Sequence, residues 1–289
     1  MGGNLIDVLR LGLRNSPNHW LSGAKRIETD YGSVRVLDTG GNKPAIVNVP
    51  DGPNVIEHHE YLIKKLSRRF RVICFEMPGT GFSFPSPRYD YSLQKTARII
   101  LNVMDLLKVG RASLLFSCAN GFYAIKAAEL SPERFIHLFL AQTPSMHAMK
   151  EWVCETIPGL MRFPVVGQLL NSVLEKKLAE HWYSHALPKG TDVSRYRTVA
   201  LKALDSGSCF CLSGLVQGLS RELEVSLSAF DVPATLVWGA KDFSHRHTDS
   251  SSIYEHLPGC ELITFDHCGH FPELEDTPSY VKLVNERLN

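Results

Sequence analysis

The sequence predicts an α/β fold with a mostly parallel central sheet, helices on both faces and an inserted helical cap. Apolar, β-branched runs alternate along the chain with stretches of helical spacing. Alternating strands and helices form βαβ units, whose parallel strands are covered by helices on both faces. The alternation stops over residues 145–227, where helical patterns continue without a convincing strand. These two observations predict the fold class and its one insertion.

The strands are recognised by alternating or continuous apolar residues, and the helices by apolar residues three and four apart. The expected strands cover residues 33–37, 45–49, 70–75, 114–116, 135–141, 234–238 and 261–265. The expected core helices cover residues 57–66, 93–107 and 122–130. In the last helix we expect Thr277 at the N-cap and Pro278 at the first helical position, because both residue types are favoured there.

The insertion predicts a division of the chain into a core and a cap. Residues 1–144 form the first part of the core, residues 145–228 the cap and residues 229–289 the second part of the core. Helical patterns at 160–174 and 199–206 predict helices within the cap. We expect the cap to lie over the carboxyl ends of the strands. The alternative is that these helices are buried against the core.

Composition limits the class of protein. The chain has 289 residues, 44% hydrophobic and 21% charged, as is typical of one large soluble domain or a core with an insertion. The net charge of +1 argues against a nucleic-acid or anionic-membrane partner. No apolar run approaches the roughly 18 residues of a membrane-spanning helix. The seven cysteines are odd in number and lack a disulfide-like spacing, so a cytoplasmic location is the simplest interpretation. The oligomeric state stays open.

The segment L-L-F-S-C-A-N-G-F-Y-A, residues 114–124, passes from an apolar strand through a polar turn into a helix. A nucleophile elbow is a sharp, strained turn of this kind. Either Cys118 or Ser117 can be placed at its tip. Gly121 and Ala124 fit the close helix–strand packing only with Cys118 at the tip. We therefore interpret Cys118 as the nucleophile, with Ser117 as the alternative.

An acid and a histidine follow in later segments. Asp242 comes after the expected strand 234–238, and His270 comes after the expected strand 261–265. The chain order of nucleophile, acid and histidine is that of one known class of catalytic triad. Each of the three follows the carboxyl end of a strand, where parallel sheets place their sites. We expect Cys118, Asp242 and His270 to converge there.

Three motifs resemble the α/β-hydrolase superfamily over nearly the whole chain from about Arg26. F-E-M-P-G-T-G-F-S (75–83) resembles its D-x-P-G-x-G-x-S loop, V-W-G-A-K-D (237–242) its acid motif, and C-G-H-F-P-E-L-E (268–275) its histidine motif. The last is most similar to meta-cleavage-product hydrolases and esterase-like members. The cysteine resembles the nucleophile of dienelactone hydrolases. This resemblance implies the α/β-hydrolase fold and a hydrolase with the triad of Cys118, Asp242 and His270.

The chain departs from the family in two places. V-P-D-G-P (49–53) stands where the family has H-G-x-P, whose third residue supplies an oxyanion amide. Aligning the prolines puts Gly52 there, and a glycine can adopt a positive φ that turns its N–H inward. The other register would place Pro53 there, which has no N–H. Ala119 would supply the second amide. The elbow itself carries bulky Phe116 where a small residue is usual.

Further expectations concern the substrate and metals. Ser117 and Trp152 are candidate substrate contacts. Asp266, His267 and Cys268 stand close to His270 and are metal-ligand types, but no second ligand cluster accompanies them. We expect neither a metal nor an organic cofactor.

A cysteine nucleophile predicts acyl cleavage or acyl transfer through a thioester. The expected partner is a small-molecule or carrier-bound acyl substrate: a thioester, an activated ester or lactone, or a β-keto acyl chain, including substrates of polyketide-type natural-product tailoring. The alternative is a catalytically inactive homologue that binds a ligand or partner. Pro50 and Asp51 in the oxyanion loop, together with Phe116, favour that alternative; the matched Asp242 and His270 oppose it.

Overall fold

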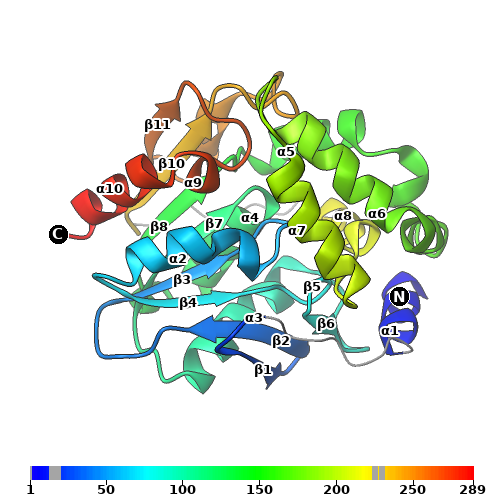
Figure 1. The fold of residues 1–289 in the computed structure, drawn as a ribbon, viewed down its shortest axis with the longest axis horizontal. Coiled ribbons are helices and arrows are strands. Elements are labelled where there is room, and N and C mark those ends of the chain that lie inside the picture. Colours follow the sequence, from blue (N-terminus) through cyan, green and yellow to red (C-terminus); the bar gives the residue numbers. More distant parts are fainter. Residues whose placement is uncertain (1, 13–20, 223–226, 228–231) are drawn as a thin grey trace.

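The computed structural model describes residues 2–12, 21–222, 227 and 232–289 (Figure 1). Its main feature is a nine-stranded sheet. The strands run in the order β1 (Ala24–Thr29), β2 (Gly32–Asp38), β4 (Arg71–Phe75), β3 (Ala45–Val49), β7 (Ala112–Ser117), β8 (Phe135–Ala141), β10 (Ala234–Gly239) and β11 (Glu261–Phe265), and β6 (Phe84–Pro85) pairs with β2. From β4 to β11 all neighbours are parallel, whereas β1, β2 and β4 pair antiparallel. The predicted fold class is confirmed.

All seven strands predicted from the sequence are present. The edge strand β1 was not predicted. Its segment A-K-R-I-E-T lies at the sheet edge without a buried residue and contains no apolar run that would predict a strand. It pairs antiparallel with β2 along its whole length, from Ala24 opposite Leu37 to Thr29 opposite Gly32. The pairing, rather than burial, makes this segment a strand.

Helices cover both faces of the sheet because strand residues alternate between two apolar clusters. Val47, Leu114 and Leu140 face the cluster that contains α3 (Leu93–Leu106) and α4 (Ala119–Leu130). Ile46 and Leu115 face the cluster that contains α2 (Glu60–Leu66) and α10 (Thr277–Arg287). The central strands are therefore buried on both sides.

The segment between β8 and β10 is mainly helical. It contains α5 (Met146–Thr156), α6 (Val166–Ala186), α7 (Ser194–Asp205) and α8 (Leu212–Glu222), which Figure 1 shows together on one side of the sheet. It also contains an unexpected short strand, β9 (Cys209–Phe210), which pairs antiparallel with β5 (Thr80–Gly81) of the core. The predicted boundary between residues 228 and 229 lies outside the described residues. The division into core and cap stays a prediction.

The remaining elements are short or terminal. They are α1 (Gly2–Gly12), α9 (Pro272–Glu275), η1 (Ile56–His59), η2 (Pro132–Arg134), η3 (Gly159–Arg162) and η4 (Ser250–Glu255). Among the described residues, no helix combines the length and the apolar composition needed to cross a bilayer.

The expected N-cap of the last helix was wrong by one residue. Asp276 precedes α10, and its side chain accepts a hydrogen bond from the Ser279 N–H at 3.2 Å. The Thr277 hydroxyl instead donates to the Glu273 carbonyl at 2.8 Å. A carboxylate accepts from the free N–H groups of a first turn at least as well as a hydroxyl does, so Asp276 takes the cap.

Candidate active site

Cys118 lies at the tip of the sharp turn between β7 and α4. Its backbone has φ 52° and ψ −129°, outside the regions usual for residues other than glycine. Its N–H donates to the Ala141 carbonyl at 2.7 Å, and its own carbonyl accepts from the Thr143 hydroxyl at 2.9 Å. A Cβ on Gly121 would lie 2.1 Å from the Thr143 hydroxyl oxygen, so glycine is required there. The turn is thus an elbow with Cys118, rather than Ser117, at its tip.

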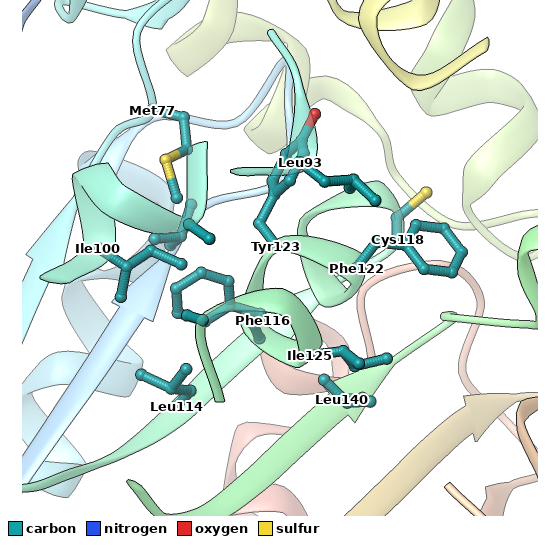
Figure 2. Close-up of a cluster of buried hydrophobic side chains, with 14 of the residues drawn as sticks. Met77, Leu93, Ile100, Leu114, Phe116, Cys118, Phe122, Tyr123, Ile125 and Leu140 are labelled. Atoms are coloured by element: carbon teal, nitrogen blue, oxygen red, sulfur yellow. The ribbon is translucent and has the colours of Figure 1, made fainter. Parts of the chain in front are cut away.

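The bulky Phe116 does not disturb this elbow. It lies in β7 with its ring fully buried in the cluster that includes Leu114 and Ile100 (Figure 2). Side chains alternate along a strand, so Phe116 and Leu114 point to the same face. Phe116 is therefore a core residue.

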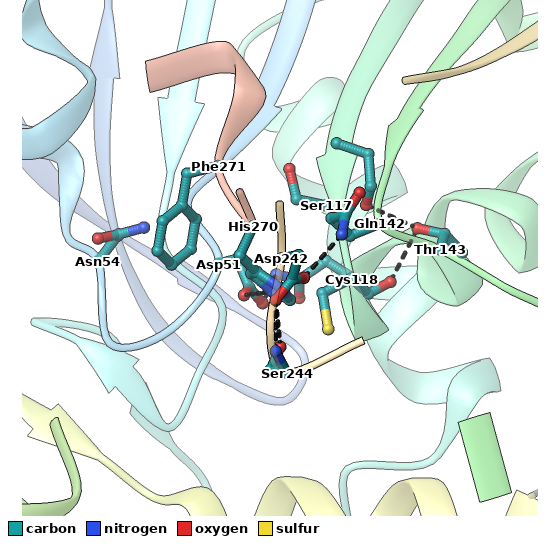
Figure 3. Close-up of polar contacts among 12 residues, drawn as sticks. Asp51, Asn54, Ser117, Cys118, Gln142, Thr143, Asp242, Ser244, His270 and Phe271 are labelled. Atoms are coloured by element: carbon teal, nitrogen blue, oxygen red, sulfur yellow. Dashed lines mark hydrogen bonds and ion pairs between the residues drawn. The ribbon is translucent and has the colours of Figure 1, made fainter. Parts of the chain in front are cut away.

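His270 and Asp242 meet beside the elbow (Figure 3). His270 Nδ1 lies 2.6 Å from Asp242 Oδ2, and both side chains are buried. The Ser244 hydroxyl and the Gln142 amide also donate to the Asp242 carboxylate, at 2.6 and 2.7 Å. The backbone N–H of His270 donates to the Ala186 carbonyl at the end of α6, at 2.8 Å. These contacts hold the imidazole in one orientation.

The structure brings the three residues of the predicted triad together. A ring nitrogen of His270 and one of His245 lie with Cys118 Sγ in a group whose atoms are all within 4.8 Å of one another. Cys118 Sγ is therefore within reach of the imidazole that Asp242 holds. This arrangement can pass a proton between the thiol and the ring.

Asp51 adds a second carboxylate to the site. It comes from the loop after β3, is 8% exposed, and places Oδ2 3.3 Å from His270 Nε2. Its Oδ1 lies 3.5 Å from the Asn120 amide, which donates to it. His270 is therefore between two carboxylates, with Asp242 at Nδ1 and Asp51 at Nε2.

The pKa values of these groups reflect burial and this charge arrangement. Burial lowers the pKa of His270, but Asp242, Cys118 and Asp51 together raise it by more, so it lies well above 6.5. Burial raises the pKa of Asp242, but His270, His245 and Ser244 together outweigh burial and bring the value to about 2. Burial and then the Asp51 charge raise the pKa of the Cys118 thiol, against smaller opposing effects of His270 and the Ala119 N–H. Burial raises the pKa of Asp51 as well. The directions of these shifts favour a resting site in which both nitrogens of the imidazole are protonated and the thiol keeps its proton.

The two predicted oxyanion residues, Gly52 and Ala119, line the same cavity as Cys118. The Ala119 N–H lies against the thiol, where it lowers the pKa. Gly52 does not have a positive φ, so the conformational reason for expecting glycine was wrong. The structure gives a steric reason instead, because a Cβ on Gly52 would lie 2.8 Å from the Phe210 ring.

A cavity of about 640 Å³ opens above the elbow. Asp51 and Cys118 lie on its core side, and Trp152 and Trp182 come from the helical segment. Trp152 donates its indole N–H to the Ser244 carbonyl at 2.9 Å, so its ring is held in place. The hydroxyl of Ser117 points elsewhere, donating to Glu273 Oε1 at 3.1 Å beneath the elbow.

Cys118, His245 and His270 are residue types that bind metals. The rings of His245 and His270 stack at 18° with centroids 5.4 Å apart, so they turn their faces toward each other. An ion bound by both rings would lie in the plane of each, which requires the rings to rotate. His267 lies apart from this group and pairs at the surface with Asp276 at 2.9 Å.

Sequence reasoning missed four contributors to the site. It gave no role to Gln142, Ser244 or His245, and it treated Asp51 only as a departure from the family. Ser244 had a weak signal, since a serine two residues after an aspartate often bonds back to it. Gln142 directly follows the predicted strand 135–141, at the sheet edge where the site was expected. Nothing in the sequence indicated that His245 would stack on His270.

The comparison with known families agrees with this geometry. The family model described as alpha/beta hydrolase fold matches residues 44–277. The chain belongs to the alpha/beta hydrolase fold family. This membership confirms the predicted superfamily and the interpretation of the chain as an α/β-hydrolase enzyme.

Individual relatives of this α/β-hydrolase are distant. The pimeloyl-[acyl-carrier protein] methyl ester esterase of Nitrosomonas europaea is 24% identical over 252 residues, which cover 85% of this chain and 96% of the esterase. The 2-hydroxy-6-oxononadienedioate/2-hydroxy-6-oxononatrienedioate hydrolase of Burkholderia vietnamiensis is 24% identical over 270 residues, covering 88% and 90%. The crystal structure of epoxide hydrolase A from Mycobacterium thermoresistibile superposes with a TM-score of 0.78 at 13% identity, covering 92% and 97%. That structural likeness shows the shared fold alone.

Proposed function

We propose that this α/β-hydrolase cleaves or transfers acyl groups through a thioester formed on Cys118. The observation that carries the proposal is the convergence of an elbow cysteine at φ 52° with a buried His270 whose Nδ1 is 2.6 Å from Asp242. A cysteine in that position attacks an acyl carbonyl, and the imidazole manages the proton. The N–H groups of Gly52 and Ala119 stabilise the oxyanion.

The proposed substrates are small-molecule or carrier-bound acyl compounds: thioesters, activated esters or lactones, and β-keto acyl chains. The esterase relative is named for an ester on an acyl-carrier protein, which supports this class. The apolar and aromatic walls of the cavity, such as Trp152 and Trp182, suit the acyl chain. Transfer of the acyl group to a nucleophile other than water, as in polyketide-type tailoring, uses the same intermediate.

The test is detection of the acyl-enzyme. The protein is mixed with p-nitrophenyl butyrate, quenched in acid and analysed by intact mass and peptide mapping. We expect one butyryl group on Cys118 in the wild type, none in Cys118→Ala, and normal labelling in Ser117→Ala. An inactive, ligand-binding homologue would show neither acylation of Cys118 nor release of nitrophenol. Turnover that persists in Cys118→Ala would overturn the proposal.

A further inference from the structure

The carboxyl group of Asp51 is held by the site and not by its own loop. Among the described residues, its side-chain hydrogen bonds go to Asn120 at the start of α4 and to His270 Nε2. The turn of the loop is made by backbone atoms, with the Asn54 N–H donating to the Asp51 carbonyl at 2.9 Å. A carboxyl group that served only to shape the loop would bond within it. This one lines the cavity beside Cys118.

The position of Asp51 changes the route open to the thiol proton. In the resting site His270 Nε2 faces both Cys118 and the Asp51 carboxylate, and the ring sits between two carboxylates. A ring that already carries a proton on each nitrogen cannot accept a third. It can pass its Nε2 proton to Asp51 while it takes the proton of Cys118. The net transfer is then from the thiol to the carboxylate.

We propose that Asp51 is a second catalytic acid–base group of this site, which takes up the proton lost by Cys118 and returns it to an oxygen leaving group. The inference rests on the proposed function and narrows its substrate class. During acylation the S–C bond forms as the thiol proton moves through His270 to Asp51. The C–O bond of the ester then breaks, and the proton moves from Asp51 to the leaving oxygen, which departs as an alcohol.

Deacylation uses the same groups in reverse. Water attacks the thioester carbonyl and gives a proton to Asp51. The S–C bond breaks, the acid is released, and the proton returns through His270 to the sulfur. Atoms and charge balance with water as the only co-reactant.

This role favours alkyl esters and lactones over thioesters. A thiolate leaves readily without a proton because thiols have a pKa of about 8.5. An alkoxide is far more basic, so its departure depends on protonation by a general acid, which typically contributes 10²–10⁴-fold to the rate. A carboxyl group beside the nucleophile that takes up the thiol proton during attack can then donate it to the second kind of leaving group.

The titratable groups that face Asp51 support the exchange. His270 follows β11, Asp242 follows β10 and Cys118 is on the elbow, while Tyr123 of α4, Tyr183 of α6 and Glu273 of α9 also sense its charge. Of these six, only His270 becomes a cation when it is protonated. Burial, and to a smaller extent the Asp242 charge, raise the pKa of Asp51 against the opposing effect of His270. The rise favours the protonated form of Asp51 once the His270 proton is transferred.

The experiment compares leaving groups on one acyl chain. Wild type, Asp51→Asn and Asp51→Glu are assayed with ethyl butyrate, S-ethyl thiobutyrate and p-nitrophenyl butyrate. The exposed variant Asp30→Asn controls for loss of a carboxylate elsewhere. We expect Asp51→Asn to lower kcat/KM by about 10²–10⁴ for the ethyl ester and by less than about tenfold for the other two. Without Asp51 the pKa of His270 falls, so the neutral ring can take the thiol proton itself and only the proton for the leaving oxygen is missing. Asp51→Glu should recover part of the ester rate. An equal loss with all three substrates would overturn the role of Asp51, while Cys118 acylation by the nitrophenyl ester would keep the proposed function.

A second readout needs neither turnover nor a particular acyl chain. Iodoacetamide labelling of Cys118 is followed against pH in wild type and Asp51→Asn. Removing the Asp51 charge should shift the labelling profile to lower pH and speed labelling at pH 7, because that charge opposes the thiolate. An unchanged profile would overturn the coupling. If Asp51→Asn does not fold, Asp51→Ser replaces it in both assays.

Discussion

Gln142 links the carboxylate of Asp242 to the backbone of the strand that precedes it. Its amide nitrogen donates to Asp242 Oδ2 at 2.7 Å, and its amide oxygen accepts from the Gly239 N–H at 2.7 Å. Gln142 itself has a positive φ of 49°. One strained residue after β8 thus satisfies a backbone N–H at the end of β10 and a carboxylate after it, and it orients the acid that holds His270.

Replacing Gln142 with glutamate tests this link. Gln142→Glu keeps the acceptor for Gly239 but sets two carboxylates against each other. We expect the free energy of unfolding to fall by about 1–3 kcal/mol at pH 8, with partial recovery as pH falls and the new carboxyl is protonated. Urea denaturation at pH 5 and pH 8 measures it. Ser244→Ala, which removes a neutral donor to Asp242, should lose stability equally at both pH values. A loss in Gln142→Glu that does not depend on pH would contradict the prediction.

The geometry of the elbow predicts that Cys118, and not Ser117, is required for turnover. Cys118→Ala should abolish turnover and leave the fold intact, because the side chain is small and makes no contact that the turn requires. Cys118→Ser should keep only a small fraction of the rate, since an alkoxide is harder to form than a thiolate. Ser117→Ala should stay active and lose about 1 kcal/mol of stability with its bond to Glu273. Steady-state kinetics and melting curves check all three, and exchanged results for Cys118→Ala and Ser117→Ala would show that the nucleophile is Ser117.

The oxyanion amide of Gly52 is tested by a pair of variants. Gly52→Ala and Gly52→Pro both place a Cβ 2.8 Å from the Phe210 ring, but only the proline removes the N–H. We expect kcat of the proline variant to lie about 10²–10³ below that of the alanine variant. The loss should be the same for all leaving groups, since every acylation forms an oxyanion. Equal rates in the two variants would show that Gly52 is not a donor.

A proline at position 52 also restricts the residue before it, which is Asp51. The leaving-group series separates the two causes. A displaced Asp51 would slow the ethyl ester more than the nitrophenyl ester, whereas a missing oxyanion donor would slow both.

Glu273 predicts a pH dependence of stability. Burial raises its pKa from 4.5 to about 7, and its Oε1 accepts from Ser117. The native state therefore holds a proton that the unfolded chain has lost, so this group lowers stability as pH rises from 4.5 to about 7, by roughly 3 kcal/mol in total. Glu273→Gln should remove that decline. Urea titrations at pH 4.5 and pH 8 measure it, with the exposed Glu133→Gln as control. The same decline in wild type and Glu273→Gln would contradict the assignment.

The order and type of the main elements were readable from the sequence because local patterns encode them. Buried parallel strands such as β4, where Val72 to Phe75 are all apolar, are continuous apolar runs, and α3 shows the spacing of a half-buried helix. The elbow was readable for a similar reason, since Gly121 and Ala124 mark a helix start pressed against a strand. Polar edge strands and two-residue strands such as β9 carry no such local pattern, so they were missed.

The convergence of Cys118, Asp242 and His270 could be predicted from the sequence because each follows the end of a strand, and parallel strands end at one edge of the sheet. The side chains that contact these three residues could not be predicted from the sequence. The contact of Asp51 with His270 joins residues 219 positions apart, and Gln142 reaches Asp242 across 100 positions. Only the tertiary structure decides such contacts, because they depend on the angles of loops and the packing of the helical segment. The charge state of the thiol and the imidazole depends on them, since burial and neighbouring charge set a pKa and neither is a property of a residue in isolation.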